Sequence, residues 1–312
     1  MSTQPQRDII RDGFKDMHAQ PSDVGASHSA ARATAFTDQH RLVHPTDQEL
    51  AHAFAENLFD LFRAMTHLPD AELEETPQLS RHCAFPFNPM FKGVWQTRCP
   101  DSETENAITE TIAWFTARRA PFFFWWIDPR ARPANLAARL IARGFAAWEE
   151  NAPGMAAPLE DLNFDLMTRV PAGFEMRPVQ NENDLNDFKI AFVTGMGVPD
   201  WAGQAWVDAT RAYGIARAPW QPYVGRLNGK PVAANMLFCG AGVASVFGVA
   251  TTPDARGQGI GAAITLIAYH DARQLGYRYG VLFATDLGAP VYRRIGFKDV
   301  GVGMSRYMWR AQ

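Results

Sequence analysis

The chain has 312 residues, 47% of them hydrophobic and 20% charged, and a formal net charge of −3. This length allows two domains, and the composition is that of a soluble globular protein, which excludes a fibrous or low-complexity chain. The 30 basic residues form no long run, which argues against a nucleic acid or an anionic membrane as partner.

Cysteine and histidine positions give no sign of a metal site. Cys83, Cys99 and Cys239 are few, odd in number and far apart, as is typical of a reducing compartment. The histidines within residues 1–44 also lack the close spacing of metal ligands. The chain starts without the apolar region of a signal peptide, and its longest strongly apolar run, 121–127, is shorter than the ~20 residues of a membrane helix. We therefore expect a cytoplasmic protein that binds no metal and no membrane.

Residues 1–44 are polar and are expected to form a mobile arm. Order is predicted from Thr46, because Thr46-Asp47-Gln48-Glu49 has the pattern of a capping box and precedes apolar residues at helical spacing. The elements predicted after this helix are two short strands near 84–85 and 91–95, a helix over 102–117, a strand over 122–127, a helix over 134–142 and a strand over 146–148. A turn at Asn151-Ala152-Pro153-Gly154 is predicted to begin a domain boundary.

The next predicted elements are a strand over 174–179, a helix over 184–192 and a hairpin of strands 223–227 and 231–239 around Asn228-Gly229. The segment between the helix and the hairpin is rich in aromatic residues, among them Trp201 and Trp206. These side chains either belong to the core or shape an apolar acceptor pocket.

A glycine-rich turn then joins a buried strand, 243–250, to a helix that begins near Gly259. Gly257, Gly259 and Gly261 carry no Cβ that could keep a ligand away from the backbone N–H groups. Because the first N–H groups of a helix have no intrahelical partner and the helix dipole is positive there, this turn can bind a pyrophosphate. The alternative is a glycine turn that serves only tight packing.

The spacing in this turn distinguishes between ligand classes. The Rossmann fingerprint places its first glycine at the end of the strand, whereas six residues intervene here, and the lysine of a P-loop is absent. The stretch instead resembles the acetyl-CoA signature of the GNAT acetyltransferase superfamily, V-x-x-x-P-x-x-R/Q-x-x-G-x-G/A. Its positions are filled by Val249, Pro253, Arg256, Gly259 and Gly261.

The next part of the sequence is also similar to the GNAT pattern. A strand is predicted over 279–284, and Tyr292-Arg293-Arg294-Ile295-Gly296-Phe297 matches the Y-x-x-x-G-F element. Closing strands are predicted over 297–302 and 305–309. Thr285 stands where many members have Asn, so the resemblance does not extend to a cofactor contact made by that residue.

The resemblance implies a set of cofactor-binding residues for acetyl-CoA: Val249, Ala250, Arg256, Gly257, Gln258, Gly259, Ile260, Gly261 and Ala262. It implies that a backbone N–H near Val249 or Ala250 polarises the thioester carbonyl, and that Tyr292 protonates the departing thiolate. The helices that carry Trp201 and Trp206 are expected over the acceptor. The general base stays open between Asp200, Asp208 and an ordered water.

The order strand, acidic residue, helix, Gly-Phe, strand occurs at 122–148 and again at 279–302, which indicates an internal repeat. The first copy has neither the R-x-x-G-x-G turn nor the tyrosine. We therefore expect an α/β (α+β) fold of two GNAT-like domains, each with a mixed, mostly antiparallel central sheet flanked by helices. The domains are a degenerate copy without a CoA cradle at 45–162 and an acetyltransferase domain at 163–312. Two unrelated α/β units are the alternative.

The expected function is an N-acetyltransferase that uses acetyl-CoA and transfers the acetyl group directly to a primary amine of a small molecule, an amino-acid-like compound or a peptide. The alternative is a non-catalytic acyl-CoA-binding sensor or interaction protein. Neither the acceptor nor the oligomeric state follows from the sequence.

Overall fold

The computed structural model describes residues 41–66, 68, 71–84, 91–216 and 220–311. The polar arm expected over residues 1–44 lies almost entirely outside these described residues. Residues 45–162 are called the first half of the chain, and residues 163–312 are called the second half.

The first half begins with α2 (Asp47–Met65), which starts at the predicted capping box. The Thr46 hydroxyl accepts a hydrogen bond from the Glu49 N–H (3.3 Å), and the Glu49 carboxylate accepts one from the Thr46 N–H (2.7 Å). The other elements of this half are β1 (Glu72–Glu75), β2 (Ser80–Cys83), β3 (Lys92–Trp95), α3 (Thr104–Ala117), β4 (Phe122–Ile127), α4 (Leu136–Ala142) and β5 (Ala146–Pro158).

The second half contains the predicted hairpin, buried strand and long helix in the predicted order. Its elements are β6 (Phe174–Pro178), α5 (Glu182–Met196), α6 (Asp200–Tyr213), β7 (Trp220–Leu227), β8 (Lys230–Gly240), β9 (Val243–Thr251), α7 (Ile260–Gln274), β10 (Tyr279–Phe283), α8 (Ala289–Ile295) and β11 (Lys298–Arg310).

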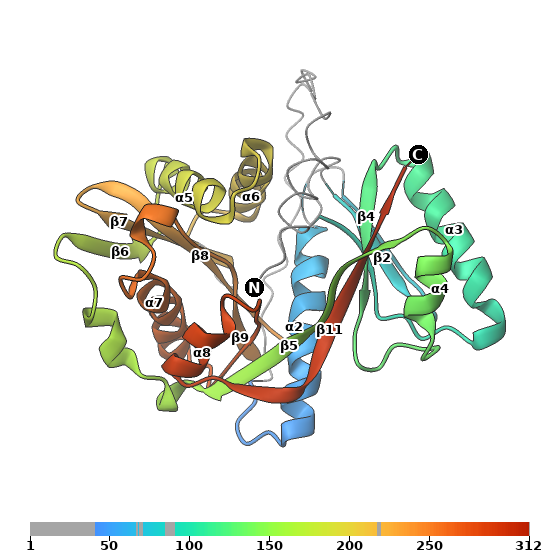
Figure 1. The fold of residues 1–312 in the computed structure, drawn as a ribbon, viewed down its shortest axis with the longest axis horizontal. Coiled ribbons are helices and arrows are strands. Elements are labelled where there is room, and N and C mark those ends of the chain that lie inside the picture. Colours follow the sequence, from blue (N-terminus) through green and yellow to red (C-terminus); the bar gives the residue numbers. More distant parts are fainter. Residues whose placement is uncertain (1–40, 67, 69–70, 85–90, 217–219, 312) are drawn as a thin grey trace.

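All of the described strands belong to one sheet with the order β1-β2-β3-β4-β11-β5-β10-β9-β8-β7-β6. The mixed α/β fold with a mostly antiparallel sheet is confirmed, but the two halves share this sheet. In the first half two antiparallel pairings lead to the parallel pairing of β3 with β4, and in the second half three antiparallel pairings lead to the parallel pairing of β9 with β10. The last strands are then exchanged, because β11 pairs with β4 of the first half and β5 pairs with β10 of the second. Both strands run from one half into the other (Figure 1).

The exchange corrects two local predictions. Residues 151–154, predicted as a boundary turn, lie inside β5, where Asn151 has a φ of 52° and the pairing with β11 is irregular. The two predicted closing strands are one strand, β11, which contains Gly301 at a φ of 73°. Turn-forming residues here produce bulges within long strands, because β5 and β11 pair with each other both before and after the irregular positions.

The sheet is strongly bent where the halves join. Two strands, β11 and β5, separate β4 from β10, which would place them about 14 Å apart in a flat sheet. The ring centroids of Trp126 on β4 and Phe283 on β10 are nevertheless only 6.1 Å apart. This face of the sheet is therefore concave at the junction.

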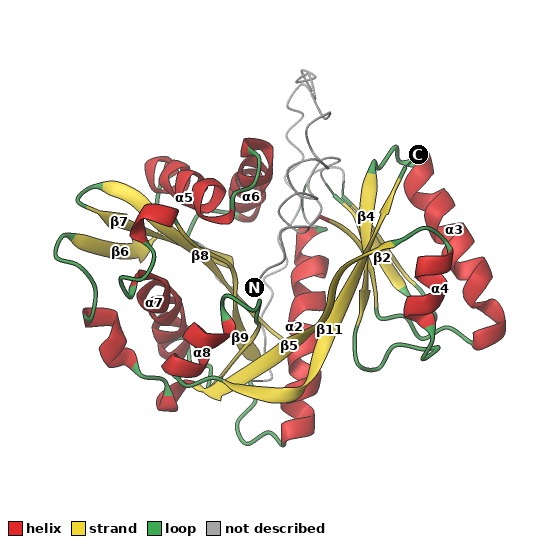
Figure 2. Ribbon diagram, viewed as in Figure 1, coloured by secondary structure: helices red, strands yellow, loops and turns green. Residues whose placement is uncertain are grey.

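Helices cover both faces of the sheet (Figure 2). On the concave face, α2, α5 and α6 pack in one continuous core. On the other face, α7 packs over the second half and α3 and α4 over the first, in two separate cores. The side chains of β4 alternate between these faces, since Phe124 and Trp126 enter the concave-side core and Phe123 and Trp125 the opposite one.

Helix α2 connects the two halves on the concave face. The Asn57 side-chain amide donates to the carbonyl oxygens of Gly240 (3.0 Å) and Val243 (3.3 Å) in the second half. The Asp60 carboxylate accepts a hydrogen bond from the Ala241 N–H (2.9 Å). Because Asn57 is buried, losing these bonds would leave polar groups without partners, so the contact fixes how the halves meet.

Candidate active site

The second half contains an opening between two parallel strands. Over their described length, β9 and β10 pair only at Ala244–Ser245 with Gly280–Val281, at the start of both strands. Beyond this point they diverge. On its other side β9 has a bulge, because its register with β8 places Gly248 and Val249 opposite the single residue Asn235. A bulge leaves backbone groups outside the ladder, so β9 can present an N–H toward the opening.

The glycine-rich turn leads from the diverging end of β9 into α7. Gly257 and Gly259 have φ values of 75° and 82°, which favour glycine. A Cβ at Gly257 would meet no atom of the described residues within 4 Å, whereas a Cβ at Gly259 would clash with the carbonyl oxygen of Arg169. Gly259 is thus required by packing and conformation alone. Gly257 leaves open space beside the first N–H groups of α7, and this space fits a bound phosphate group.

Arg256 and Gln258 flank the turn and bond to the backbone. The Arg256 guanidinium donates to the carbonyl oxygens of Thr251 (3.1 Å) and Gly195 (2.9 Å), which ties the end of α5 to the turn. The Gln258 amide donates to the carbonyl oxygen of Asp254 (3.2 Å). Both side chains thus stabilise the shape of the turn, and their predicted contact with acetyl-CoA remains a prediction.

Tyr292 lies on α8, and its ring packs against Phe297 with a centroid distance of 6.4 Å. Burial raises the pKa of Tyr292 to about 12. Among the described residues its hydroxyl has no hydrogen-bond partner. A protonated phenol with an unused donor can give a proton to a nearby anion.

Tyr269 on α7 was not identified from the sequence, because its position on the apolar face of a helix is that of a core residue. Its hydroxyl donates to the carbonyl oxygen of Val281 (2.9 Å), where the pairing of β9 with β10 ends. Burial, and after it the neighbouring Tyr292, raise the pKa of Tyr269. The rings of Tyr269 and Tyr292 both pack against Phe297, with centroid distances of 5.1 and 6.4 Å, so the two phenols lie near each other.

The concave face beside the opening is aromatic. Phe247 on β9 and Phe283 on β10 have ring centroids 6.3 Å apart, and Phe283 also contacts Trp126. Trp206 is buried against Phe91 of the first half. Trp201 is half-buried at the edge of the same core. This face is where the acceptor is expected, and a direct role of the two tryptophans remains a prediction.

The carboxylates considered as bases lie on the outer surface of α6. Asp200 forms an ion pair with Lys189 (3.0 Å) and is largely exposed. Asp208 accepts hydrogen bonds from Gln204 (2.9 Å) and Arg211 (3.2 Å). No contact among the described residues places Asp200 or Asp208 at the opening between β9 and β10.

The equivalent position in the first half is closed. The Arg98 guanidinium makes two bonds to the buried Asp128 carboxylate (2.9 and 3.0 Å), and Trp125 donates to the Thr97 hydroxyl (2.9 Å). The Arg132 N–H donates to the Thr97 carbonyl oxygen (3.0 Å). These bonds hold the chain after β3 against the chain after β4, so the two strands do not open as β9 and β10 do.

Acidic residues also mark the start of α3, which corresponds to α7 in the second half. Asp101 and Glu103 lie in the turn before it, and Glu105 lies in its first turn. Carboxylates repel phosphate at the helix end where a phosphate would bind. Together with the bonds that join the chain after β3 to the chain after β4, these carboxylates make the start of α3 unlike the glycine turn before α7.

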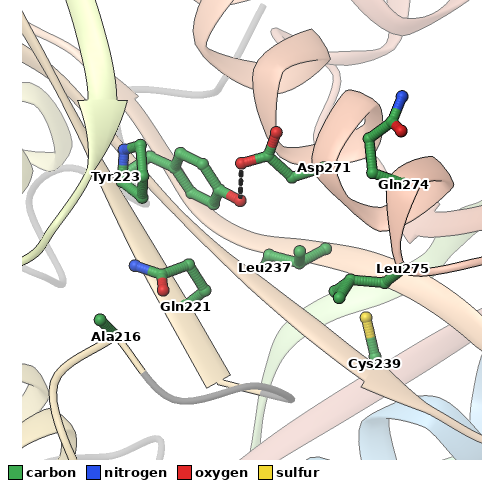
Figure 3. Close-up of a pocket in the computed structure, with 9 residues that line it drawn as sticks. Ala216, Gln221, Tyr223, Leu237, Cys239, Asp271, Gln274 and Leu275 are labelled. Carbon is green, nitrogen blue, oxygen red and sulfur yellow. Dashed lines mark hydrogen bonds between the residues drawn. The ribbon is translucent and has the colours of Figure 1, made fainter.

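A pocket of about 370 Å³ lies beside the other end of α7 (Figure 3). Inside it the Tyr223 hydroxyl donates to Asp271 (2.9 Å), and burial together with this carboxylate raises the pKa of Tyr223. Asp271 is about three turns along α7 from Ile260. The pocket is thus separate from the glycine turn.

None of the helices in the described part of the chain has the length and apolar character needed to cross a bilayer. Nor do the described residues bring three His, Cys, Asp or Glu side chains together in a group that could hold a metal ion.

Comparison with protein families gives a match over residues 196–297, to the family described as "Acetyltransferase (GNAT) family". The matched region runs from the end of α5 to Phe297 and includes the bulge, the glycine turn and Tyr292. No curated protein sequence matches the chain.

Several solved structures have a similar fold. A GCN5-related N-acetyltransferase from Kribbella flavida has a TM-score of 0.64 and 18% identity, over 83% of this chain and 96% of that one. One from Sphaerobacter thermophilus has a TM-score of 0.54 and 16% identity, over 85% and 94%. A tandem GNAT protein from the clavulanic acid biosynthesis pathway has a TM-score of 0.53 and 12% identity, over 86% and 95%. At these identities the similarity concerns the fold alone.

Proposed function

We propose, from the GNAT acetyltransferase domain that lies within residues 196–297, that this protein is an N-acetyltransferase that uses acetyl-CoA as cosubstrate. It transfers the acetyl group directly to a primary amine of a small molecule, an amino-acid-like compound or a peptide. The acyl group and the amine meet at the opening between β9 and β10.

One observation carries the proposal: β9 has a bulge, diverges from β10 and leads through an open glycine turn into α7. The N–H groups at the start of α7 can hold the pyrophosphate, with Gly257, Gln258, Ile260, Gly261 and Ala262 around them. The bulge at Gly248 and Val249 can direct an N–H at the thioester carbonyl, from Val249 or Ala250, and stabilise the charge that develops there.

The transfer needs an acid at the departing sulfur. The amine attacks the thioester carbonyl, the C–S bond breaks, and the thiolate takes a proton from Tyr292. This phenol suits the task because burial keeps it protonated and its hydroxyl has no partner among the described residues. The amine loses its proton to a base that we do not assign.

A second candidate function is a non-catalytic acyl-CoA sensor. A sensor requires the glycine turn but has no use for a proton donor at the thioester. The unused hydroxyl of Tyr292 therefore favours the enzyme.

We further propose that the chain is a tandem of a degenerate copy at 45–162 and an active domain at 163–312. The repeated pairing order supports this division, and the Arg98–Asp128 pair supports the loss of the first site. One acetyl-CoA should bind per chain, which equilibrium dialysis measures. Two equivalent sites per chain would contradict the closed first half.

Thiol release from acetyl-CoA tests the enzyme proposal, with a panel of primary amines, amino-acid-like compounds and short peptides as acceptors. We expect release that depends on both acetyl-CoA and one class of amine, with mass spectrometry showing the acetylated amine. Desulfo-CoA, which keeps the pyrophosphate but lacks the thiol, is the control for binding alone. Tight binding of acetyl-CoA without amine-dependent release across the panel would favour the sensor.

A further inference from the structure

Arg306 on β11 is a charged side chain held among aromatic rings. Its guanidinium carbon lies 5.2 Å from the ring centroid of Trp126 and 5.6 Å from that of Phe124. The side chain is 18% exposed. It belongs to the concave face, where the halves meet.

In the described part of the chain, the guanidinium of Arg306 has one ion-pair partner. One nitrogen, Nη2, lies 2.9 Å from the carboxylate of Glu149 on β5, and the buried Nε–H has no partner among the residues that the structure describes. A guanidinium has five N–H donors in a planar fork. Buried donors in proteins are nearly always satisfied, so an unpaired one beside a charge needs an explanation.

The position of Arg306 connects it with the candidate active site. Phe247 precedes the bulge of β9 and contacts Phe283, Phe283 contacts Trp126, and Trp126 lies against Arg306. All four side chains are on the concave face, the face opposite α7. Arg306 is thus two ring contacts from Phe283, on the expected acceptor side.

We propose that Arg306 binds a carboxylate of the acceptor, so that the acceptor is an amino acid or another amine that carries a carboxylate. This inference rests on the proposed function. The planar fork of Arg306 matches a carboxylate, and the aromatic rings beneath it exclude water and strengthen the bond. Glu149 holds the guanidinium in position, and its negative charge disfavours a doubly charged phosphate at the same place.

The strand exchange makes this site. Glu149 comes from the last strand of the first half and Arg306 from the last strand of the second, and the two residues are register partners in the β5–β11 ladder. The first half, which lacks the features of a CoA site, thereby contributes to the recognition of the acceptor.

The test uses glycine, β-alanine and γ-aminobutyrate, each paired with its carboxamide. We expect the wild-type protein to prefer the carboxylate over the amide for at least one length, both in calorimetric affinity and in kcat/KM. Arg306→Gln should reduce that preference about 10- to 100-fold, the loss expected for a charge-assisted hydrogen bond. The KM for acetyl-CoA should change little.

Glu149→Gln should change the preference for the carboxylate in the opposite direction. It keeps the size of the side chain and removes the charge that competes with the ligand, so the preference for the carboxylate should rise. Damage to the fold would weaken carboxylate and amide alike in both variants. Arg306→Lys keeps the charge without the planar fork and should retain part of the preference for the carboxylate. If Arg306→Gln does not fold, the same measurements are made on Arg306→Lys instead.

The outcomes separate the two proposals. In one outcome, no amine of the panel causes thiol release, but the protein binds carboxylates selectively and Arg306→Gln abolishes this binding. That outcome would overturn the acetyltransferase proposal and retain the anion site. Turnover of amines with equal affinity for carboxylate and amide would overturn the role of Arg306 and retain the enzyme. If Arg306→Gln weakened the binding of the carboxylate and of its carboxamide to the same extent, the Arg306–Glu149 ion pair would be purely structural.

Discussion

At the scale of single residues, Tyr292 decides between an enzyme and a sensor. Replacing it by Phe removes one hydroxyl and keeps the ring that packs against Phe297. We expect unchanged affinity for acetyl-CoA and a fall in single-turnover rate of about 10²- to 10⁴-fold, the usual contribution of a general acid. Rapid-quench measurements check this. Full activity in Tyr292→Phe would mean that another group protonates the sulfur.

The pH dependence of the same residue follows from its raised pKa. Burial penalises the phenolate, so the acid form of Tyr292 persists up to about pH 12. Tyr292→Phe should therefore lower the rate by the same factor at every pH between 6 and 10, and the shape of the profile should not change. A limb of the profile that disappears in the variant would show that the phenol titrates within this range.

Gly261 offers a test of the pyrophosphate site that spares the fold. Among the described residues, a Cβ there would meet only the Thr251 hydroxyl, at 3.4 Å. Gly261→Asp places a negative charge at the start of α7, which stabilises the helix but repels a phosphate. Acetyl-CoA affinity should fall at least about tenfold in Gly261→Asp, and much less in the matched Gly261→Ala. Equal affinities by calorimetry would place the pyrophosphate elsewhere.

At the scale of elements, Asp184 joins the start of α5 to the sheet. Its buried carboxylate accepts hydrogen bonds from Arg177 on β6 (2.6 Å) and Arg226 on β7 (2.8 Å). Burial alone would raise the pKa of Asp184, but these bonds and the one from the Gln180 N–H outweigh it, so the pKa is lowered. A carboxylate whose pKa is lower in the folded state stabilises the fold above its unfolded pKa, about 3.9.

Asp184→Asn should therefore lower the free energy of unfolding by about 2–3 kcal/mol at pH 7, the contribution of hydrogen bonds to a charged group. The difference from wild type should shrink as the pH falls below about 4 and the carboxylate becomes protonated. Urea denaturation at both pH values measures this. The control is Glu182→Gln in the same turn, whose exposed pair with Arg211 should contribute at most about 1 kcal/mol.

At the scale of the whole molecule, the exchanged strands make the two halves one folding unit. Five pairs join β5 to β10 and six join β11 to β4, so each half is completed by a strand of the other. A protease site inserted after Ala172, which is exposed, would cut the chain between β5 and β6, near the start of the second half, without cutting a strand. The two fragments should elute together under native conditions and keep their affinity for acetyl-CoA.

The matched control carries the same inserted site without protease treatment. Separation of the fragments at neutral pH without denaturant would show that each half folds alone and that the exchange contributes little to stability. Unfolding in urea should separate them, because only non-covalent contacts then join them.

The sequence by itself determined the parts of this protein that depend on neighbours in the chain. The capping box at Thr46, the hairpin at Asn228-Gly229, the aromatic strand at 122–127 and the path from β9 through the glycine turn to α7 all lie where local spacing predicts them. Such features follow from backbone conformation and from side chains three or four residues apart, so the pattern of residues along the sequence predicts them.

Only the tertiary structure decided which strands pair over long distances. Glu149 and Arg306 are 157 residues apart, and no periodicity in either strand indicates that they meet. Asn151, with a conformation usual in turns, lies in a bulge because β11 pairs with β5 both before and after it. The bend of the sheet and the Arg98–Asp128 pair likewise depend on contacts between distant segments, whose free energies are set by the packing of the whole fold and not by any one stretch of sequence.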